Sequence, residues 1–577
     1  MSRVPPEAES QMTRLSLTLD CLKPSYHVVV VGSGYGGGVA ASRLARAGKR
    51  VAVFERGREF VTGEFPARFP DLRREMQLSG GAVRMGSAAG LFDVRLGKDM
   101  HVLVGCGLGG GSLINAGVAL RPDPRVFADG AWPGQIAQDG TLDEGYARAA
   151  RWVRPARDPL ATEQTKFKAL QTCSEAVGQA PVAAPVVVSF EEVVNPAGVR
   201  QPACTRCGDC CGGCNVGAKN TVALTYLPDA VRHGAEIFTH ARVSHVTKRA
   251  DGTWEVFFEG KDDAGAAAVN RSVIADMVIL AAWTLGSTEI LLRSRERGLA
   301  VSDRLGQGFS ANGDIIAFGY GAKIPVNAVG VGHPPKVENL QVGACVSGQI
   351  EIVDEDDLAK SLTIQEGVLP SALAPILPVL FIPNGRLLGA LQSLVAGVYK
   401  GPFAGLQTFF AVSHDSASGR LVLEDGRLTV RWPEAKDEPV YRRLDEKLDA
   451  LVTRAGGSYV KNPLAGTMMG QQPATAHPLG GCGMGRERGD GVVNHKCQVF
   501  NGTAGSGLSD VHEGLFVIDG SIMPRSLGVN PLLTITALAE RAMMHLARDR
   551  GLSFDADAVA GVAPVSVRAP GAVAAEA

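Results

Sequence analysis

The stretch YHVVVVGSGYGGGVAASRLARAGKRVAVFERG, residues 26–57, decides the fold of this chain. It begins with a β-branched run at 27–31, which predicts a buried central strand of a parallel sheet. Three glycines follow with the spacing G-x-G-x-x-G: Gly32, Gly34 and Gly37. They open a predicted helix, and a second strand after the helix ends at Glu55. The order strand, glycine turn, helix, strand predicts an α/β nucleotide-binding domain.

The glycine turn and Glu55 together indicate a dinucleotide. Glycines let the backbone approach a pyrophosphate, which sits at the helix N-terminus. Glu55 follows the glycines by about 20 residues, where an acid accepts hydrogen bonds from ribose hydroxyls. A 2′-phosphate would be repelled by this carboxylate, so NADP is disfavoured. The alternative is a glycine turn that only packs a helix on a strand.

The composition describes a large globular protein. The chain has 577 residues, which predicts two or more domains. It is 45% hydrophobic and 20% charged, and its net charge is −1. This balance gives no electrostatic reason to bind nucleic acid. No apolar run is long enough to predict a transmembrane segment.

The two ends of the chain carry little structural signal. Residues 1–23 form a predicted N-terminal arm without the apolar core of a secretory signal, so we expect a cytoplasmic, reducing location. Residues 555–577 are rich in Ala, Val and Pro and predict a flexible tail.

Further glycine-rich stretches recur along the chain and favour a long, extended cofactor. They are GLGGGSLINAG, LGQGFSANGD, HPLGGCGMG and FVIDGSIMPRSLGVNPLLTITALAER. In order and spacing, the chain resembles the glucose–methanol–choline (GMC) oxidoreductase family, especially its cholesterol-oxidase-like branch. The resemblance implies an FAD-binding Rossmann-like α/β domain and an α+β substrate domain with an antiparallel sheet over the flavin. It also implies oxidation of an alcohol CH–OH group by hydride transfer to flavin N5.

The resemblance also implies roles for individual residues. The ADP half of FAD would contact Gly32, Gly34, Gly37 and Glu55. The isoalloxazine would lie over Gly109, Gly110, Gly111, Ser112 and Asn115. The ribityl–pyrophosphate region would contact Asp519 and Gly520. The active-site pair would be His477 and Asn530, the latter also contacting the cofactor.

The residues themselves support both active-site roles. Pro478 disfavours helical backbone at His477, and an imidazole held there can accept a hydroxyl proton near neutral pH. The alternative is a histidine that only packs in its loop. Asn530 is predicted as a helix N-cap with Pro531 at the first helical position, and capping alone could explain it. The positive end of that helix would also stabilise charge on reduced flavin.

The chain departs from the family pattern near the predicted site. Cholesterol-oxidising relatives carry a second base, a glutamate, where this chain holds Ala374. Glu366 could substitute for it, but an ordinary loop carboxylate is the favoured reading. Some family members attach FAD covalently near His101; its register is about one residue off, so packing is favoured. His414 is also predicted to be structural.

The region 367–410 is almost uncharged and contains four early prolines, which exclude a membrane span. The length of this region and its lack of alternating polar and apolar residues favour an apolar lid or tunnel wall over ordinary core. Such a wall favours a lipophilic alcohol, a sterol or terpenoid, as substrate. Burying apolar substrate surface against it would contribute roughly 25 cal/mol of binding free energy per Å². A rim with peripheral membrane contact is the weaker alternative.

A group of five cysteines lies within residues 204–214. The four metal-ligand candidates are Cys204, Cys207, Cys210 and Cys214, spaced C-x2-C-x2-C-x3-C as in bacterial ferredoxins. This favours an iron–sulfur cluster ([4Fe-4S] or [3Fe-4S]); some sugar-oxidising members of the resembled family carry one in a comparable insertion. Zinc, disulfides and reactive thiols stay open as alternatives, and Cys211 is left over.

Three functions follow. The first is an FAD-dependent dehydrogenase whose electrons leave through the cluster to an external redox protein or quinone. The second is an alcohol oxidase that uses O2 and makes H2O2, with structural cysteines. The third is a non-catalytic flavin or metal electron carrier. The predicted FAD-binding domain is discontinuous, at 24–125, 222–312 and 500–550, and the substrate domain takes 126–221 and 313–499.

Overall fold

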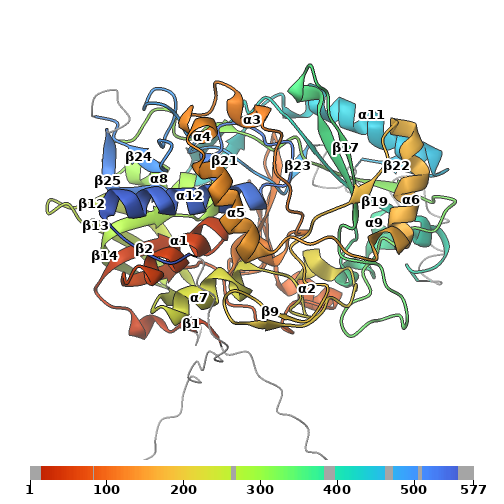
Figure 1. Cartoon of the computed structure of the whole chain (residues 1–577), viewed down its shortest axis with the longest axis horizontal. Coiled ribbons are helices and arrows are strands. Elements are labelled where there is room, and N and C mark those ends of the chain that lie inside the picture. Colours follow the sequence, from red (N-terminus) through yellow and green to blue (C-terminus); the bar gives the residue numbers. More distant parts are fainter. Residues whose placement is uncertain are drawn as a thin grey trace, which may run out of the picture.

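The structure is a computed structural model that describes residues 14–81, 83–260, 268–381, 397–461, 472–503 and 510–556. Figure 1 shows a sheet covered by helices on one side of the molecule and a second sheet with its own helices on the other. This mixture of a parallel and an antiparallel sheet confirms the predicted fold class.

A parallel sheet forms the first half. Its strands run in the order β1 (Ser16–Leu17), β11 (Glu236–Phe238), β3 (Val51–Phe54), β2 (Ser25–Val31), β14 (Val269–Leu280) and β25 (Val511–Val517). The β-branched run predicted as the central strand lies in β2, where residues 28–31 are buried. A parallel sheet covered by helices buries both faces, which explains why this strand does not alternate apolar and polar side chains.

Antiparallel strands extend this sheet at two places. The first half of β14 pairs with β13 (Trp254–Gly260), which pairs with β12 (Ala241–Lys248). β24 (Gln498–Phe500) pairs with β25. The first half of β14 therefore continues a three-stranded meander, and its second half lies in the centre of the parallel sheet.

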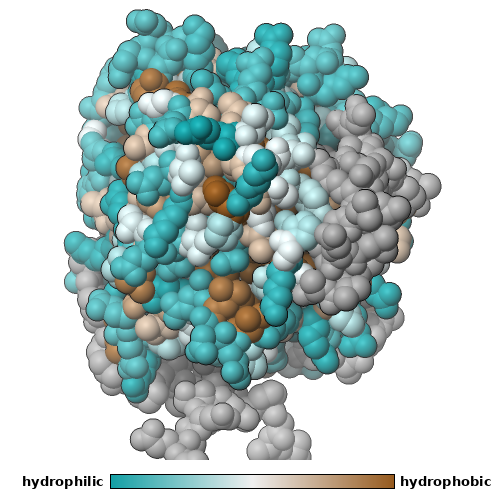
Figure 2. Space-filling model, turned by 90° about the vertical axis from the view of Figure 1, so that its right-hand side faces the viewer, coloured by the Kyte–Doolittle hydropathy of each residue, from teal (hydrophilic) through white to brown (hydrophobic). Residues whose placement is uncertain are grey.

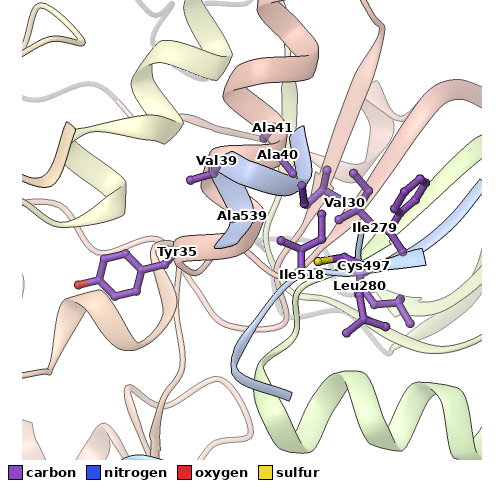
Figure 3. Close-up of a cluster of buried hydrophobic side chains, with 14 of the residues drawn as sticks. Val30, Tyr35, Val39, Ala40, Ala41, Ile279, Leu280, Cys497, Ile518 and Ala539 are labelled. Carbon is purple, nitrogen blue, oxygen red and sulfur yellow. The ribbon is translucent and has the colours of Figure 1, made fainter. Parts of the chain in front are cut away.

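Helix α1 (Tyr35–Arg46) starts at the glycine turn, as predicted, and packs against α12 (Leu532–Arg550) and α7 (Tyr226–Arg232). α12 also packs along α5 (Thr141–Val153). Figure 3 shows side chains of α1 and α12 close to those of β2 and β14 in this core. A fully buried ion pair, Arg43 to Glu540 at 2.6 Å, joins α1 to α12.

The second half is built on a six-stranded antiparallel sheet. Its order is β22 (Ser458–Val460), β16 (Ile315–Tyr320), β19 (Gln407–Ser413), β18 (Leu362–Glu366), β17 (Gly348–Ile352) and β8 (Val182–Ala183). Helix α11 (Pro439–Arg454) contacts β16 and β22, and α6 (Thr165–Cys173) contacts α11 and β18. This is the antiparallel sheet that the sequence predicts for the substrate-binding half.

Smaller sheets join the two halves. A five-stranded sheet contains β23 (Ala474–Thr475), β7 (His101–Gly105), β6 (Phe92–Arg95), β4 (Met76–Gly80) and β5 (Val83–Met85). A three-stranded sheet contains β15 (Gln307–Phe309), β20 (Gly419–Glu424) and β21 (Arg427–Arg431). Short strands β9 (Val193–Val194) and β10 (Arg200–Gln201) pair with each other. Within the described residues, the remaining α-helices are α2 (Phe69–Arg74), α3 (Arg125–Ala128), α4 (Gln135–Gln138), α8 (Trp283–Arg295) and α9 (Leu377–Leu380).

The prediction that Asn530 caps the last helix is wrong by one residue. α12 begins at Leu532 with Pro531 in the N-cap position, and no side chain caps it. The Asn530 side chain is therefore available for other contacts, which are described below. The boundaries of the two domains stay a prediction.

No helix in the described part of the chain combines the length and apolar character needed to cross a bilayer. Figure 2 shows the end of the molecule that carries the antiparallel sheet, where hydrophobic side chains lie in small patches between hydrophilic ones. The predicted membrane-contacting rim falls partly on residues 382–396, outside the described residues.

Candidate active site

A cavity of about 1390 Å³ opens beside the glycine turn. Four of the predicted cofactor residues line it: Gly32, Gly34, Glu55 and Gly110. They come from the β2–α1 turn, the end of β3 and the loop after β7. Tertiary folding thus brings two separate glycine loops and the predicted ribose-binding acid around one space large enough for a dinucleotide.

The glycines of the turn differ in what surrounds them. A Cβ built on Gly36 would lie 1.7 Å from the Ile518 carbonyl oxygen, and one on Gly37 would lie 2.0 Å from the Gly32 oxygen. A Cβ on Gly34 would meet nothing within 4 Å. Gly36 and Gly37 therefore serve helix–sheet packing, whereas Gly34 faces the cavity at the start of α1. This is where a pyrophosphate would reach the helix N-terminus.

Glu55 is buried and already hydrogen-bonded. Its Oε2 accepts the Ser33 hydroxyl at 2.6 Å, and its Oε1 accepts the Gly57 amide at 2.8 Å. These bonds hold the carboxylate in one orientation at the cavity wall and leave acceptor capacity for ribose hydroxyls.

The second glycine loop lies against the first. A Cβ on Gly110 would come within 3.0 Å of the Gly34 Cα. The Ser112 hydroxyl donates to the Gly109 carbonyl at 2.6 Å and accepts the Val222 amide at 3.0 Å. Asn115 donates from Nδ2 to the Tyr35 hydroxyl at 2.9 Å. The predicted flavin loop is therefore held at both of its ends by the first nucleotide-binding unit.

Trp283 is a cavity residue that the sequence did not reveal. It starts α8 with a φ of +69°, which is strained for a bulky residue. A Cβ on Gly111 would lie 2.0 Å from its ring, so only glycine fits at that position. An indole at a strained turn beside the cofactor cavity carries no sequence pattern, because its neighbours come from a distant loop.

Asp519 and Gly520 lie just after β25, outside the lining of the cavity. The Asp519 carboxylate accepts bonds from the Ser521 amide at 2.8 Å and from the Ser287 hydroxyl. Burial raises the pKa of Asp519, and these hydrogen bonds oppose that shift. The structure thus gives Asp519 a role in fixing the turn that follows β25.

His477 and Asn530 meet, although 53 residues separate them in the chain. Their closest polar atoms, His477 Nε2 and Asn530 Nδ2, lie 3.5 Å apart. On its other side His477 Nδ1 lies 3.3 Å from Asp314 Oδ2. The Asn530 Oδ1 accepts a 2.6 Å bond from Gln365 Nε2. The predicted active-site pair is therefore held between two residues that sequence analysis did not single out.

Asp314 is itself fixed in place. Its Oδ2 accepts the Ala476 amide at 2.7 Å and the Thr475 hydroxyl at 3.3 Å. Nδ1 makes no hydrogen bond in this geometry, but the negative charge of Asp314, 3.3 Å away, favours the tautomer that carries its proton on Nδ1. This leaves Nε2, the nitrogen nearest Asn530, as the acceptor. Asp314 ends the motif LGQGFSANGD, which is the only sign of it in the sequence.

The loop that carries His477 is attached to the cofactor-binding half. The Thr284 hydroxyl, at the start of α8, donates to the Pro478 carbonyl at 2.7 Å. The Gly480 amide donates to the Gly520 carbonyl at 3.1 Å. Because α8 borders the cavity and Gly520 follows β25, these bonds set the position of the imidazole relative to the nucleotide-binding loops.

Glu366 is not the loop carboxylate that the sequence favours. It ends strand β18, where it is buried and paired with Lys166 at 2.8 Å. Its other oxygen accepts the amides of Ser347 and Gly348 at 2.9 and 2.7 Å. A carboxylate with these partners is part of the structure and is not free to move a proton. Ala374 lies in an apolar cluster and offers no polar atom.

The described parts of the predicted lid pack as an aromatic cluster. Phe381 contacts Phe318, Tyr320 and Phe403 with ring centroids 5.5 to 5.7 Å apart. These rings close one side of the antiparallel sheet with apolar surface. The middle of the predicted lid, residues 382–396, lies outside the described residues.

Two histidines fit their structural readings. Met100, just before β7, and Val102 and Val104 on β7 line the cavity and His101 does not, as expected when side chains alternate along a strand. This arrangement gives no support to covalent attachment of FAD at His101. His414 is buried beside the Ser526 hydroxyl, and burial lowers its pKa to about 4.

The four candidate cysteines lie near one another, and a further cysteine joins them. Burial raises the pKa of Cys204 to about 12 and of Cys207 to about 11, and neighbouring thiols add to both shifts. Cys345 arrives from a distant loop, and its Sγ lies 3.3 Å from the Sγ of Cys211. Its amide also donates to the Cys210 sulfur at 3.4 Å. Sequence spacing could not reveal Cys345, because it lies more than a hundred residues away.

Lys219 connects this cysteine cluster to the predicted flavin loop. Its buried Nζ lies 3.1 Å from the Cys210 carbonyl, 2.6 Å from that of Asn115 and 3.2 Å from that of Leu113. Three carbonyl acceptors match the three donors of an ammonium group. A cation therefore lies between the cysteines and the loop at 109–115.

The geometry bears on two of the alternatives for the cysteines, disulfides and zinc. All eleven are free thiols. A tetrahedral zinc ion with bonds of about 2.3 Å needs sulfurs less than about 4 Å apart. Within the described residues, only Asp139, His495 and His545 place three ligand atoms within 4.8 Å of one another. A polynuclear cluster is not tested by this criterion, because iron and sulfide ions lie between its cysteines.

Comparisons with known proteins agree with this arrangement. The family model described as GMC oxidoreductase matches residues 30–311 in its N-terminal part and residues 416–539 in its C-terminal part. The chain is 28% identical to a cholesterol oxidase of Mycobacterium tuberculosis, over 90% of this chain and 91% of that one. It is 25% identical to a long-chain-alcohol oxidase of Arabidopsis thaliana, over 89% of this chain and 66% of that one.

A solved structure shows the same fold. Pyridoxine 4-oxidase from "Mesorbium loti" superposes with a TM-score of 0.57 at 17% identity, over 90% of this chain and 99% of that one. At this identity the likeness supports the fold alone.

Proposed function

The chain belongs to the GMC oxidoreductase family, an FAD-type family of alcohol oxidoreductases, and we propose that it oxidises the CH–OH group of a lipophilic alcohol at His477. The observation that carries this proposal is the contact of His477 with Asn530, held by Asp314 and Gln365. It places one proton acceptor and one hydrogen-bond donor side by side, which is what removal of a hydroxyl proton requires.

His477 acts as the base in this proposal. With the proton on Nδ1, beside Asp314, Nε2 carries the lone pair that accepts the hydroxyl proton when the substrate oxygen takes the place of Asn530 Nδ2 beside it. Asn530 Nδ2 donates to the substrate oxygen and holds it beside Nε2. Removal of the proton raises electron density on the oxygen and weakens the adjacent C–H bond toward hydride loss.

The described residues fit FAD as the cofactor. The open face of Gly34 suits a pyrophosphate, and Glu55 has acceptor capacity for the ribose. Gly110 of the second glycine loop lines the same space, and Asn115 at the end of that loop bonds Tyr35 of α1. When bound, FAD supplies the acceptor for the hydride that leaves the carbinol carbon.

A lipophilic substrate is supported by two observations. The relatives that match most of this chain are named cholesterol oxidase and long-chain-alcohol oxidase, and both substrates are largely apolar. The substrate-binding half also contains the aromatic cluster around Phe381, whose rings are buried against one another. Burying apolar substrate surface contributes about 25 cal/mol per Å².

For the electrons, we propose an outlet through a cluster held by Cys204, Cys207, Cys210 and Cys214. Burial lowers the pKa of Lys219, and negative charge on the neighbouring cysteine sulfurs opposes that shift, so a negatively charged thiolate-bound cluster beside Cys210 would favour the ammonium form, which in turn would offset its charge. Through Lys219 the cysteine loop also lies next to the loop at 109–115. An iron–sulfur cluster there would provide a one-electron route to an external acceptor; without it, O2 is the acceptor that the oxidase relatives suggest.

Anaerobic flavin reduction tests the oxidation. Cholesterol and 1-dodecanol are mixed with the holoenzyme, and glucose and methanol serve as polar controls. We expect bleaching at 450 nm with an apolar alcohol only, and a loss of at least about 10²-fold in the rate for His477→Asn. Equal rates for His477→Asn and the wild type would refute the assigned base.

Iron and acid-labile sulfide analysis tests the outlet. Protein purified anaerobically should contain both, and the Cys207→Ala/Cys210→Ala double variant should contain neither while keeping its FAD. Stoichiometric H2O2 during turnover, with no iron in the protein, would favour the oxidase alternative.

A further inference from the structure

Gln365 is the side chain that holds the Asn530 carboxamide. It lies in β18, one residue before Glu366, and both Gln365 and Asn530 are buried. Its Nε2 donates to Asn530 Oδ1 at 2.6 Å, the shortest polar contact of this group. Because side chains alternate along a strand, Gln365 faces the active site and Glu366 faces Lys166 on the other side.

The contacts around His477 can be assigned as donors and acceptors in one consistent way. Asp314 Oδ2 lies 3.3 Å from His477 Nδ1 without forming a hydrogen bond, and its negative charge favours a proton on Nδ1 and a lone pair on Nε2. Nε2 then requires a donor, which is the Nδ2–H of Asn530. The Asn530 oxygen therefore points away from His477, toward Gln365, which must present N–H to it. If either the Asn530 or the Gln365 amide were turned over, two hydrogen-bond acceptors would face each other.

We infer that Gln365 is a positioning residue that fixes the Asn530 carboxamide with its N–H toward the substrate and the base. This inference rests on the proposed function. Turning the Asn530 amide over would place its oxygen opposite the lone pair of Nε2. The imidazole would then have to hold a proton on Nε2 and could no longer accept one from the substrate.

Other ionisable groups near this contact have partners of their own. The Lys166–Glu366 pair lies on the opposite face of β18. His414 and Asp415 follow β19, the neighbouring strand; His414 lies near Gly528 and Ser526, and Asp415 bonds the Ser310 hydroxyl. Asp314 accepts a hydrogen bond from the loop of His477, and it is the one charged group at this site that does so among the described residues. A pH effect seen on changing Gln365 would therefore arise at His477 and Asn530.

The decisive variant is Gln365→Glu, which keeps the shape and removes the donor. A carboxylate can only accept, so Asn530 must turn its N–H toward position 365 and its oxygen toward His477. With the alcohol that reduces the wild type best, we expect flavin reduction at pH 7 to fall at least ~10-fold, because the base is held protonated. The pH of half-maximal reduction should rise by about one unit or more.

Gln365→Met is the matched control, since it keeps the volume and offers neither donor nor acceptor. We expect a fall of about fivefold, the effect of one neutral hydrogen bond, with the pH of half-maximal reduction unchanged. The new carboxylate would by its charge alone raise the pH of half-maximal reduction, so the inference also requires the slower reduction in Gln365→Met, and a wild-type rate in that uncharged variant would overturn it. Thermal unfolding and FAD content establish that each variant is folded and loaded.

A second measurement does not need turnover. In holoenzyme labelled with ring-15N histidine, the His477 signal is identified by its loss in His477→Asn. At pH 7 we expect the wild type to show a protonated Nδ1 and a bare Nε2, and Gln365→Glu to show both nitrogens protonated. Wild-type tautomer and rate in Gln365→Glu would overturn the inference. If no alcohol reduces the wild type, the proposed function fails, and the 15N spectra still decide the role of Gln365.

Discussion

Replacing Gly34 and Gly36 by alanine separates cofactor binding from packing within one turn. Gly34 has a φ of −69°, and a Cβ added there would meet no atom within 4 Å, so alanine fits the folded chain. We expect Gly34→Ala to leave the free energy of unfolding of the apoprotein unchanged or to raise it by up to about 1 kcal/mol. The methyl group would occupy the space through which the FAD pyrophosphate approaches the helix.

The loss of FAD affinity should be large. A methyl group in the closest part of the pyrophosphate contact forces the phosphates away from the α1 N-terminus and its amides. We expect the dissociation constant for FAD to rise at least ~100-fold, which corresponds to about 2.7 kcal/mol. Gly36→Ala should act differently: its Cβ would lie 1.7 Å from the Ile518 carbonyl oxygen, so α1 must shift from β25. Such overpacking costs about 1–3 kcal/mol of stability.

The assay titrates FAD into the apoprotein of each variant and follows the quenching of flavin fluorescence. Thermal unfolding of the same samples measures stability. A Gly34→Ala protein that binds FAD within about threefold of the wild type would refute the placement of the pyrophosphate at this turn. A Gly36→Ala apoprotein that unfolds at the wild-type temperature would refute the packing role of that glycine.

Four further outcomes are expected. Asp314→Asn should slow flavin reduction about 10- to 100-fold, because the carboxylate 3.3 Å from Nδ1 stabilises the imidazolium that forms when Nε2 takes the proton; an unchanged rate would remove Asp314 from the site. Glu366→Gln should lower stability to urea by about 3 kcal/mol, since it leaves the buried ammonium of Lys166 uncompensated, while the rate of flavin reduction stays near the wild-type value. Burial lowers the pKa of His414 to about 4, so its neutral form stabilises the fold fully above pH 6.5 and this contribution, up to about 3 kcal/mol, is lost as the pH falls toward 4; His414→Gln should show a flatter decline of stability over that range. Lys219→Met should lower the iron content of anaerobically purified protein at least ~5-fold if the ammonium offsets a cluster, and equal iron content would contradict that role.

Local signals were sufficient where the chemistry lies within one stretch of chain. The run at 27–31, the glycines of the turn and Glu55 lie within one unit, and their order is enough to predict β2, α1 and β3. His477 and Asn530 could be proposed because each lies in a distinct motif. The cap assigned to Asn530 was wrong because Pro531 suits either the N-cap or the first helical turn, and helix ends are poorly determined by sequence.

Contacts between distant segments gave no such signal. Asp314, Gln365 and Cys345 are ordinary residues of a loop or a strand until folding places them against His477, Asn530 and Cys211. Glu366 and Gln365 are neighbours in sequence, but their side chains lie on opposite faces of the strand. Glu366 pairs with Lys166, and Gln365 contacts Asn530. Which of the two reached the active site depended on the register of β18 in its sheet.

The sequence by itself determined the nucleotide-binding unit, the α/β class and the two residues proposed for chemistry. These depend on short-range backbone geometry: buried β-branched runs, glycine conformations and a proline after a histidine. Only the tertiary structure decided which atom of the imidazole is free to act. That depends on Asp314 and Gln365, whose hydrogen bonds have a direction only once segments far apart in the chain lie within about 3 Å of one another.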